Sequence, residues 1–251
     1  MKARIMTFNT QHCASYKEGL KINFPIFSAV IAKYGADVVG LNEIRSVGKS
    51  EDYKDQTAIL AEGAGYPYYL FGEAIRFGGV NPYGNALLSK HKIKKSSTVL
   101  IPDPTVRAYN GYYETRSLCK ARLECGLTVI SVHVGLNPDE RENAVRIILD
   151  SLEKEKCILM GDFNMEPDDP ILAPIKARLF DTGSVIKGNS LTFPSDAPTR
   201  KIDYIFTTPD ITVEGAFVPS DVVSDHLPLI ADITFQGEIN EDLFNSTEIQ
   251  L

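Results

Sequence analysis

Eight polar residues follow short apolar runs of the sequence, and their side chains could bind a cation and move a proton. They are Asn9, Glu43, His133, Asp162, Asn164, Asp203, Asp225 and His226. Oxygen ligands from Asp, Glu and Asn, without clustered cysteine or histidine, are typical of sites for hard divalent cations such as Mg²⁺ or Mn²⁺. Mg²⁺ usually keeps water and substrate phosphate in its coordination shell, so this set of residues indicates phosphate ester chemistry.

A histidine held by an aspartate would supply the base for such a reaction. The carboxylate fixes the tautomer of the imidazole and stabilises its protonated form. A zinc hydrolase is a weaker interpretation, because the chain lacks a histidine-rich ligand set and none of its four cysteines forms a Cys-x-x-Cys pair. A catalytically silent binding module is also less favoured, because it would not need the complete set of polar groups.

The stretch Ile158–Asn164 shows how such residues would be positioned. Four apolar or small residues precede Asp162 and Asn164, which is typical of a strand buried on both faces. Residues two apart at the end of a strand point the same way, so both side chains would project from the rim of a sheet. Taken alone, a loop in which the Asp and Asn satisfy a turn explains this stretch equally well.

A strand–helix–strand pattern with polar strand ends occurs twice in the chain. The first copy has predicted strands at 4–8 and 37–41 around a helix at 24–34, and the second has strands at 127–133 and 158–164 around a helix from Asn137 to about Lys154. Two similar halves predict an α/β fold with two mixed sheets packed face to face and helices outside, a four-layer α/β-β/α sandwich. The polar strand ends would then meet at one rim.

Length and composition predict one domain over residues 1–236, followed by a polar C-terminal tail over 237–251. The formal net charge of −7 and the missing basic stripe do not favour nucleic acid as a partner. We expect a cytoplasmic monomer without stable membrane insertion, because no apolar segment of 18 residues occurs and the N-terminus has no signal-like apolar region. Predicted loops over 72–83 and 102–113 would form the substrate wall.

Six motifs in this order resemble the endonuclease/exonuclease/phosphatase superfamily, which includes deoxyribonuclease I. They are Asn9 after a strand, Asn42-Glu43, Ser131-Val-His133, Gly161-Asp-Phe-Asn164, Lys201-Ile-Asp203-Tyr and Ser224-Asp-His226. The resemblance extends from Arg4 to Phe235. One position departs from some nuclease members, since Gln11 stands where they have a second acidic residue.

The resemblance implies a role for each matching residue. Glu43 would be the principal metal ligand, with Asn9 supporting the metal and Asp225 beside it. His226 would be the base, Asp203 would orient it, Asp162 and Asn164 would position the water and a phosphate oxygen, and His133 would hydrogen-bond the phosphate. Arg116 is a candidate phosphate contact. Either Asp162 or His226 could hold the water, and we favour His226 because an aspartate beside Mg²⁺ is a weak base.

The resemblance therefore implies a Mg²⁺- or Mn²⁺-dependent hydrolase of phosphoester bonds, with a phosphodiester as the first expectation. A water activated by a His-Asp pair would attack phosphorus in line. Two alternatives remain open: a nuclease acting on DNA or RNA, and a phosphomonoesterase for inositol phosphates or lipid headgroups.

Overall fold

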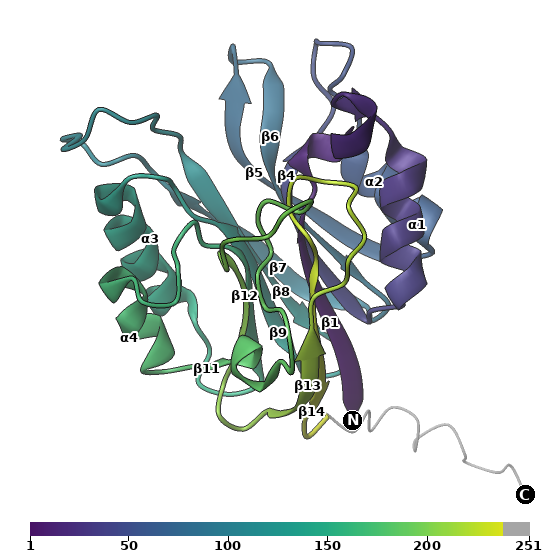
Figure 1. Ribbon diagram of the computed structural model, residues 1–251, viewed down its shortest axis with the longest axis vertical. Helices are drawn as coiled ribbons and strands as arrows, with labels where there is room; N and C mark the ends of the chain where they lie inside the picture. Colours follow the sequence, from purple (N-terminus) through teal and green to yellow (C-terminus); the bar gives the residue numbers. More distant parts are fainter. Residues whose placement is uncertain (238–251) are drawn as a thin grey trace, which may run out of the picture.

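The computed structural model describes residues 1–237, and two six-stranded sheets form its centre (Figure 1). The first sheet has the order β13-β14-β1-β4-β6-β5, with strands Thr212–Phe217, Leu229–Thr234, Lys2–Asn9, Val38–Arg45, Asn81–Ser89 and Tyr68–Phe77. The second has the order β11-β12-β10-β9-β8-β7, with strands Phe180–Asp181, Asp203–Thr207, Cys157–Asp162, Thr128–His133, Arg116–Leu123 and Ile93–Ile101. A small third sheet pairs β2 (Ala14–Ser15) with β3 (Lys21–Ile22).

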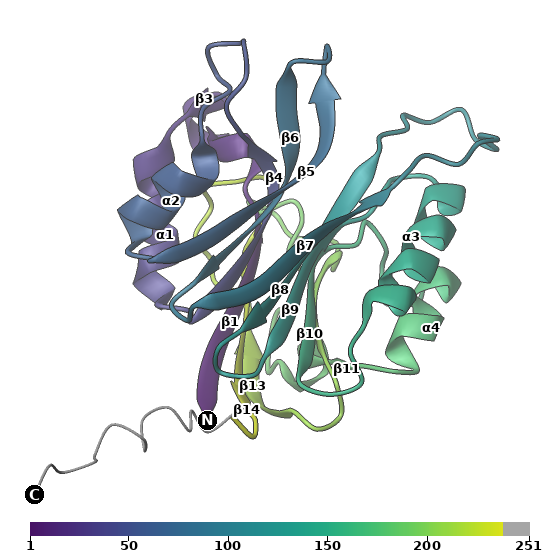
Figure 2. The same ribbon diagram turned by 180° about the vertical axis from the view of Figure 1, so that it is seen from behind.

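The helices lie on the outer faces of the two sheets (Figures 1 and 2). Helices α1 (Phe24–Tyr34) and α2 (Gln56–Ala64) cover the first sheet, and α3 (Pro138–Ser151) and α4 (Ala173–Lys176) cover the second. Three apolar clusters fill the spaces between the four layers, one between the sheets and one beneath each pair of helices. The predicted α/β-β/α sandwich is thus confirmed. None of the described helices is long and apolar enough to cross a membrane.

Each sheet contains one parallel pair of strands at its centre, and a helix connects the two strands of the pair. Strand β1 runs parallel to β4 across α1, and β9 runs parallel to β10 across α3. Antiparallel strands flank both pairs, β14 and β6 in the first sheet and β8 and β12 in the second. Both strands of a parallel pair end at the same edge, so this duplicated arrangement brings the predicted polar strand ends to one rim.

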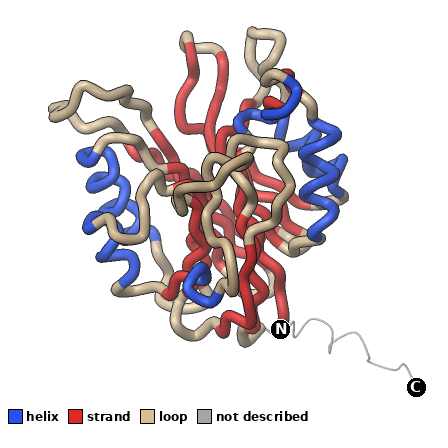
Figure 3. Tube along the Cα trace, in the orientation of Figure 1, coloured by secondary structure: helices blue, strands red, loops and turns tan. Residues whose placement is uncertain are grey.

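Several predicted elements differ from the structure. The stretch 72–83 is mostly not a loop, because β5 continues to Phe77 and β6 begins at Asn81, which makes a long hairpin (Figure 3). Helix α3 ends at Ser151 rather than near Lys154. The predicted loop over 102–113, by contrast, agrees with the structure, because the segment 102–115 contains no described helix or strand. The predicted tail over 237–251 lies, except for Gly237, outside the described residues.

Gly161 is placed where a side chain cannot fit. Its φ is +144°, and a Cβ there would lie 1.8 Å from the Val132 carbonyl oxygen on the neighbouring strand. We expect Gly161→Ala to lower the free energy of unfolding by about 2–4 kcal/mol, because it adds both backbone strain and an overlap with the main chain. Urea unfolding measures this. Gly215→Ala is the matched control, since nothing lies within 4 Å of a Cβ at that position. An equally large loss of unfolding free energy in Gly215→Ala would contradict the explanation by overlap and strain at Gly161.

Candidate active site

Strand register in the second sheet places three of the predicted residues in one row. Asp162, the last residue of β10, lies opposite His133 on β9 and opposite Asp203 on β12. All three side chains are at most 5% exposed. The Asp162 carboxylate at the end of this apolar run therefore lies between the imidazole of His133 and the carboxylate of Asp203.

The first sheet contributes Asn9 and Glu43 to the same rim. A β-bulge in β4 sets the direction of the Glu43 side chain. Leu41 pairs with Ala86 and Ile44 pairs with Gly84, so two residues of β4 face a single residue of β6. Glu43, in the bulge, has a φ of +61°. Such bulges re-aim side chains near active sites, and strained backbone of this kind often occurs there. Glu43 remains partly exposed, whereas Asn9 at the end of β1 is fully buried.

Asn9 connects the carboxylates of the two sheets. Its amide nitrogen donates to Glu43 Oε1 at 3.2 Å and to Asp162 Oδ2 at 3.0 Å. Its Oδ1 accepts from the main-chain N–H of Gln11 at 3.1 Å, which fixes the orientation of the amide. The Asn9 side chain thus holds two acidic groups, from different sheets, beside one another.

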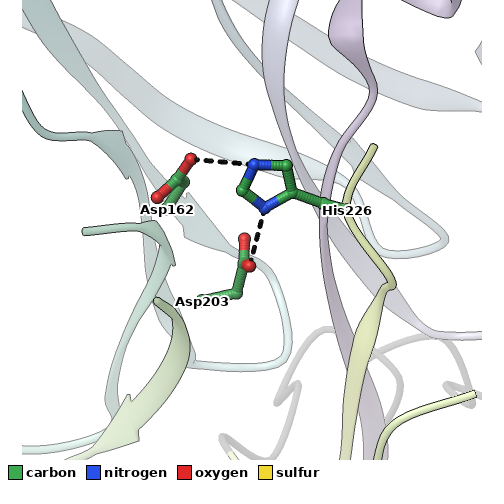
Figure 4. Close-up of side chains that lie close together, drawn as sticks. All are labelled: Asp162, Asp203 and His226. Atoms are coloured by element: carbon green, nitrogen blue, oxygen red, sulfur yellow. Dashed lines mark hydrogen bonds and ion pairs between the residues drawn. The ribbon is translucent and has the colours of Figure 1, made fainter. Parts of the chain in front are cut away.

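His226 lies between two carboxylates, as Figure 4 shows. Its Nδ1 is 2.8 Å from Asp203 Oδ2, and its Nε2 is 3.6 Å from Asp162 Oδ2. Thr192 Oγ1 donates to the same Asp203 oxygen at 2.6 Å, so this carboxylate is held from two sides. By distance alone, Asp162, Asp203 and His226 could hold a metal. Because Asp203 is committed to Thr192 and to the imidazole, the geometry suits proton transfer better than metal binding.

Asp225 precedes His226 in the loop before β14 and is held at that loop. Its carboxylate accepts from Ser224 Oγ at 3.1 Å, and its main-chain oxygen accepts from Ser195 N–H at 2.7 Å. Burial and the charge of Glu43 raise the pKa of the Asp225 carboxyl. The Glu43 and Asp225 carboxylates are therefore near enough for the charge of Glu43 to act on Asp225.

His133 and Asn164 contact each other on the opposite side of Asp162. The Asn164 amide nitrogen is 3.2 Å from His133 Nε2 and donates to the Val134 carbonyl at 3.0 Å. The Asn164 main-chain N–H donates to Asp162 Oδ1 at 2.9 Å. The turn interpretation of this stretch is therefore correct as well, and it coexists with the clustering of the polar groups.

Arg116, the candidate phosphate contact, contacts His133. Its Nη1 lies 3.1 Å from His133 Nδ1 and 2.7 Å from Glu114 Oε1. Both members of the Arg116–Glu114 pair are less than 9% exposed. The direct partners of this guanidinium are thus an imidazole and a carboxylate of the protein.

The buried charges shift the proton affinities of these groups in different directions. Burial lowers the pKa of His226, but the Asp203 and Asp162 carboxylates outweigh it and raise that pKa above its usual range. Burial raises the pKa of Asp162. Burial and the positive charge of Arg116 hold the pKa of His133 well below its usual range. Two histidines at one site therefore have opposite tendencies, His226 to accept a proton and His133 to stay neutral.

The donor set suits a hard divalent cation. Imidazole nitrogens lie near both carboxylates, His12 Nδ1 at 3.7 Å from Glu43 Oε2 and His133 Nε2 at 3.5 Å from Asp162 Oδ2. The charge of Glu43 raises the cost of ionising Asp225, and a cation between them would offset that repulsion. Oxygen donors of this kind bind Mg²⁺ or Mn²⁺ in preference to zinc. The residues present therefore fit the metal that the sequence analysis predicts.

Some residues that shape the site received no role in the sequence analysis. Asn42 donates to Asn85 Oδ1 and to the Val132 carbonyl, and it accepts from the main-chain N–H of Asp162, so it links the two sheets directly beneath the site. Thr192 Oγ1 donates to Asp203. Burial and the charge of Glu43 raise the pKa of the Tyr83 hydroxyl. A buried asparagine within an apolar strand is uncommon and could have indicated the Asn42 bridge. The contacts of Thr192 and Tyr83 depend on tertiary structure alone.

Comparisons with known proteins agree with this geometry. A sequence model described as the Endonuclease/Exonuclease/phosphatase family matches residues 6–226. A structure titled endonuclease/exonuclease/phosphatase from Beutenbergia cavernae is 25% identical, with a TM-score of 0.75 over 93% of this chain and 72% of that chain. One from Bacteroides vulgatus, of the same title, is 19% identical, with a TM-score of 0.74 over 94% and 99% of the two chains.

A third similar structure is a mannosyl-6-phosphatase from Bacteroides thetaiotaomicron. It is 16% identical and has a TM-score of 0.71 over 93% of this chain and all of that chain. No match was found among curated protein sequences. The family match covers most of the chain, and the solved structures share its fold. The chain belongs to the endonuclease/exonuclease/phosphatase family, whose members are hydrolytic phosphoesterases.

Proposed function

We propose that this chain is a Mg²⁺- or Mn²⁺-dependent hydrolase of phosphoester bonds, with a phosphodiester as its first expected substrate. One observation carries the proposal: His226 lies between Asp203 and Asp162, and Asn9 joins that same Asp162 to Glu43. A proton acceptor and a cluster of hard oxygen donors thus share one carboxylate. Hydrolysis of a phosphate ester needs both, a base for water and positive charge for the phosphoryl oxygens.

Two residues would hold the cation, and a third would support it. Glu43 and Asp225 supply carboxylates, and Asn9 fixes Glu43 in place through its amide N–H. A bound Mg²⁺ or Mn²⁺ would neutralise charge on the non-bridging oxygens and on the leaving oxygen. Asp162 and Asn164, joined by a hydrogen bond of 2.9 Å, position the water and a phosphate oxygen between them.

His226 would take the proton of the attacking water on Nε2 when its ring is neutral. A cation beside Asp162 and Asp225 would favour that neutral form, because it would offset the carboxylate charge that raises the pKa of His226. Its Nδ1–H is held by Asp203, which keeps the lone pair of Nε2 directed at the site and stabilises the imidazolium that forms. Burial of Asp203 and His226 strengthens this interaction, since little solvent competes for it. His133, on the other side of Asp162, donates a hydrogen bond to the phosphate and stabilises charge that develops there.

A phosphomonoesterase is the second candidate, and one observation favours it. A structural neighbour that matches 93% of this chain is named a mannosyl-6-phosphatase, so the same fold accommodates a phosphomonoester. The net charge of −7 weakens the third candidate, a nuclease. The segment 102–115 carries Tyr109 and Tyr112, both exposed, and lies beside the rim (Figure 1). These rings would contact the organic part of the substrate.

The activity and the substrate class are tested together. We expect bis-p-nitrophenyl phosphate to be hydrolysed faster than p-nitrophenyl phosphate in Mg²⁺ or Mn²⁺, and we expect EDTA to abolish turnover of both. A faster reaction with the monoester would select the second candidate. A panel of nucleic acid, inositol phosphate, sugar phosphate and sphingomyelin then defines the substrate. No metal-dependent turnover of any phosphoester would contradict the proposed class and would favour a silent binding module.

A further inference from the structure

The contacts of His133 restrict where its proton can be. One ring nitrogen, Nδ1, lies 3.1 Å from Arg116 Nη1. A guanidinium only donates hydrogen bonds and is not deprotonated in proteins. The Nδ1 atom must therefore accept, which requires that it carry no hydrogen. A neutral imidazole has one N–H, so the hydrogen of His133 is on Nε2.

Of the two neighbours of Nε2, one agrees with that assignment and the other, an amide donor, competes with it. It lies 3.5 Å from Asp162 Oδ2, an acceptor, and 3.2 Å from Asn164 Nδ2. The Asn164 amide has its nitrogen on the Val134 carbonyl at 3.0 Å, so its orientation is set by that bond. Of the two nitrogen donors that face the ring, the charged Arg116 has the stronger claim on a lone pair, because charge-assisted hydrogen bonds are about twice as strong as neutral ones.

Arg116 is itself held in place. Glu114 Oε1 lies 2.7 Å from the same Nη1 that faces His133. Glu114 in turn accepts from Tyr112 Oη at 3.2 Å through Oε2, and its main-chain N–H donates to Glu140 Oε1 at 3.2 Å. The guanidinium is thus fixed between a carboxylate and an imidazole, both less than 9% exposed. Such a buried pair costs desolvation free energy, which calls for a role beyond stability.

We propose that Arg116 is a positioning residue that fixes the neutral Nε2–H tautomer of His133, so that an N–H donor faces the Asp162–Asn164 side of the rim. The ring then offers a hydrogen bond to a phosphate oxygen without accepting the proton that His226 takes. The link to phosphate rests on the proposed function, but the tautomer does not, and it can be measured without any substrate.

The direct test is ¹⁵N NMR of protein labelled at histidine, because ¹⁵N shifts distinguish Nδ1–H, Nε2–H and imidazolium. The chain has four histidines, and loss of one signal set in His133→Gln identifies His133. We expect wild-type His133 to show only the Nε2–H tautomer at pH 7. Arg116→Met should give a mixture of tautomers or partial imidazolium, whereas Arg116→Lys, which retains a cationic donor, should keep Nε2–H.

Two further variants separate this role from a general effect on folding. The double variant Glu114→Gln/Arg116→Met removes both buried charges and so avoids an unpaired carboxylate; it should show the same loss of the single tautomer. Arg146→Met is the matched control, because that arginine is exposed on α3. In the variants that lose the tautomer, kcat should fall about 10- to 100-fold, as when a partner that orients a functional imidazole is removed.

Two NMR results would contradict this role of Arg116. Hydrogen on Nδ1, or an imidazolium, in wild-type His133 at pH 7 would overturn it. Unchanged His133 shifts in both Arg116→Met and the double variant would also overturn it, since another group would then fix the tautomer. Neither result depends on turnover, so failure of the phosphoesterase assignment would be recognised separately, by its own assay.

Discussion

Replacement of His226 by alanine should lower kcat by about 10²–10⁴-fold, the range for loss of a general base. The imidazole is the group that Asp203 and Asp162 surround at 2.8 and 3.6 Å, and alanine leaves both carboxylates without a proton acceptor between them. Asp203→Asn should lower kcat as well, because an amide can donate to Nδ1 and favour the wrong tautomer. The proton that water releases would then have no acceptor at the required position.

The measurement is steady-state hydrolysis of the better p-nitrophenyl ester at saturating Mg²⁺ or Mn²⁺. His91→Ala serves as the control, since the side chain of His91 lies at a turn between β6 and β7, away from the strand ends that form the rim. His91→Ala should retain the wild-type kcat. Full activity of His226→Ala would disprove the role of the imidazole while leaving the reaction class intact.

Glu43→Gln should raise the Mg²⁺ or Mn²⁺ concentration needed for half-maximal activity by at least about tenfold. The substitution keeps the size of the side chain and its contact with Asn9, but it removes the charge that we assign to the cation. Since loss of an outer-shell partner alone costs about 10- to 100-fold in metal affinity, a direct ligand should cost no less. Activity should recover in part as the cation concentration rises.

Cation titrations of activity, and calorimetric binding of Mn²⁺ without substrate, give this result directly. The matched control is Glu142→Gln, because Glu142 is exposed on α3 and should not affect the titration. An unchanged cation requirement in Glu43→Gln would mean that the metal is held elsewhere. The cluster of Asp162, Asp203 and His226 would then be the next set to substitute.

The layered fold was predictable because its central strands are buried on both faces. The apolar runs of β1, β4, β9 and β10, each followed by a polar residue, were recognisable without any structure. Peripheral strands were harder to predict. Strand β7 has a recognisable apolar run only over 99–101, but it begins at Ile93 and passes through Lys94–Thr98, an exposed polar stretch whose conformation comes from pairing with β8. Strand β13 was not predicted, because its half-exposed side chains lack a clear period.

The residues of the site were predictable as types, but their contacts were not. The apolar run before Asp162 identified Asp162 and Asn164 as candidates, yet only the register shows that Asp162 lies between His133 and Asp203. The position of Glu43 depends on a bulge, which no sequence pattern around Asn42 signals. The partner of Arg116 was likewise not predictable. The sequence made Arg116 a candidate phosphate contact, and only the structure shows that its Nη1 faces His133.

The stereochemical course at phosphorus tests the central claim most directly. A chiral phosphorothioate ester hydrolysed in ¹⁸O-labelled water, with Mg²⁺ or Mn²⁺ present, reports whether water attacks phosphorus in one in-line step. The arrangement of His226, Asp162 and Glu43 predicts inversion of configuration and incorporation of one solvent oxygen. Retention of configuration would contradict it, because two displacements would require a covalent intermediate on a protein side chain.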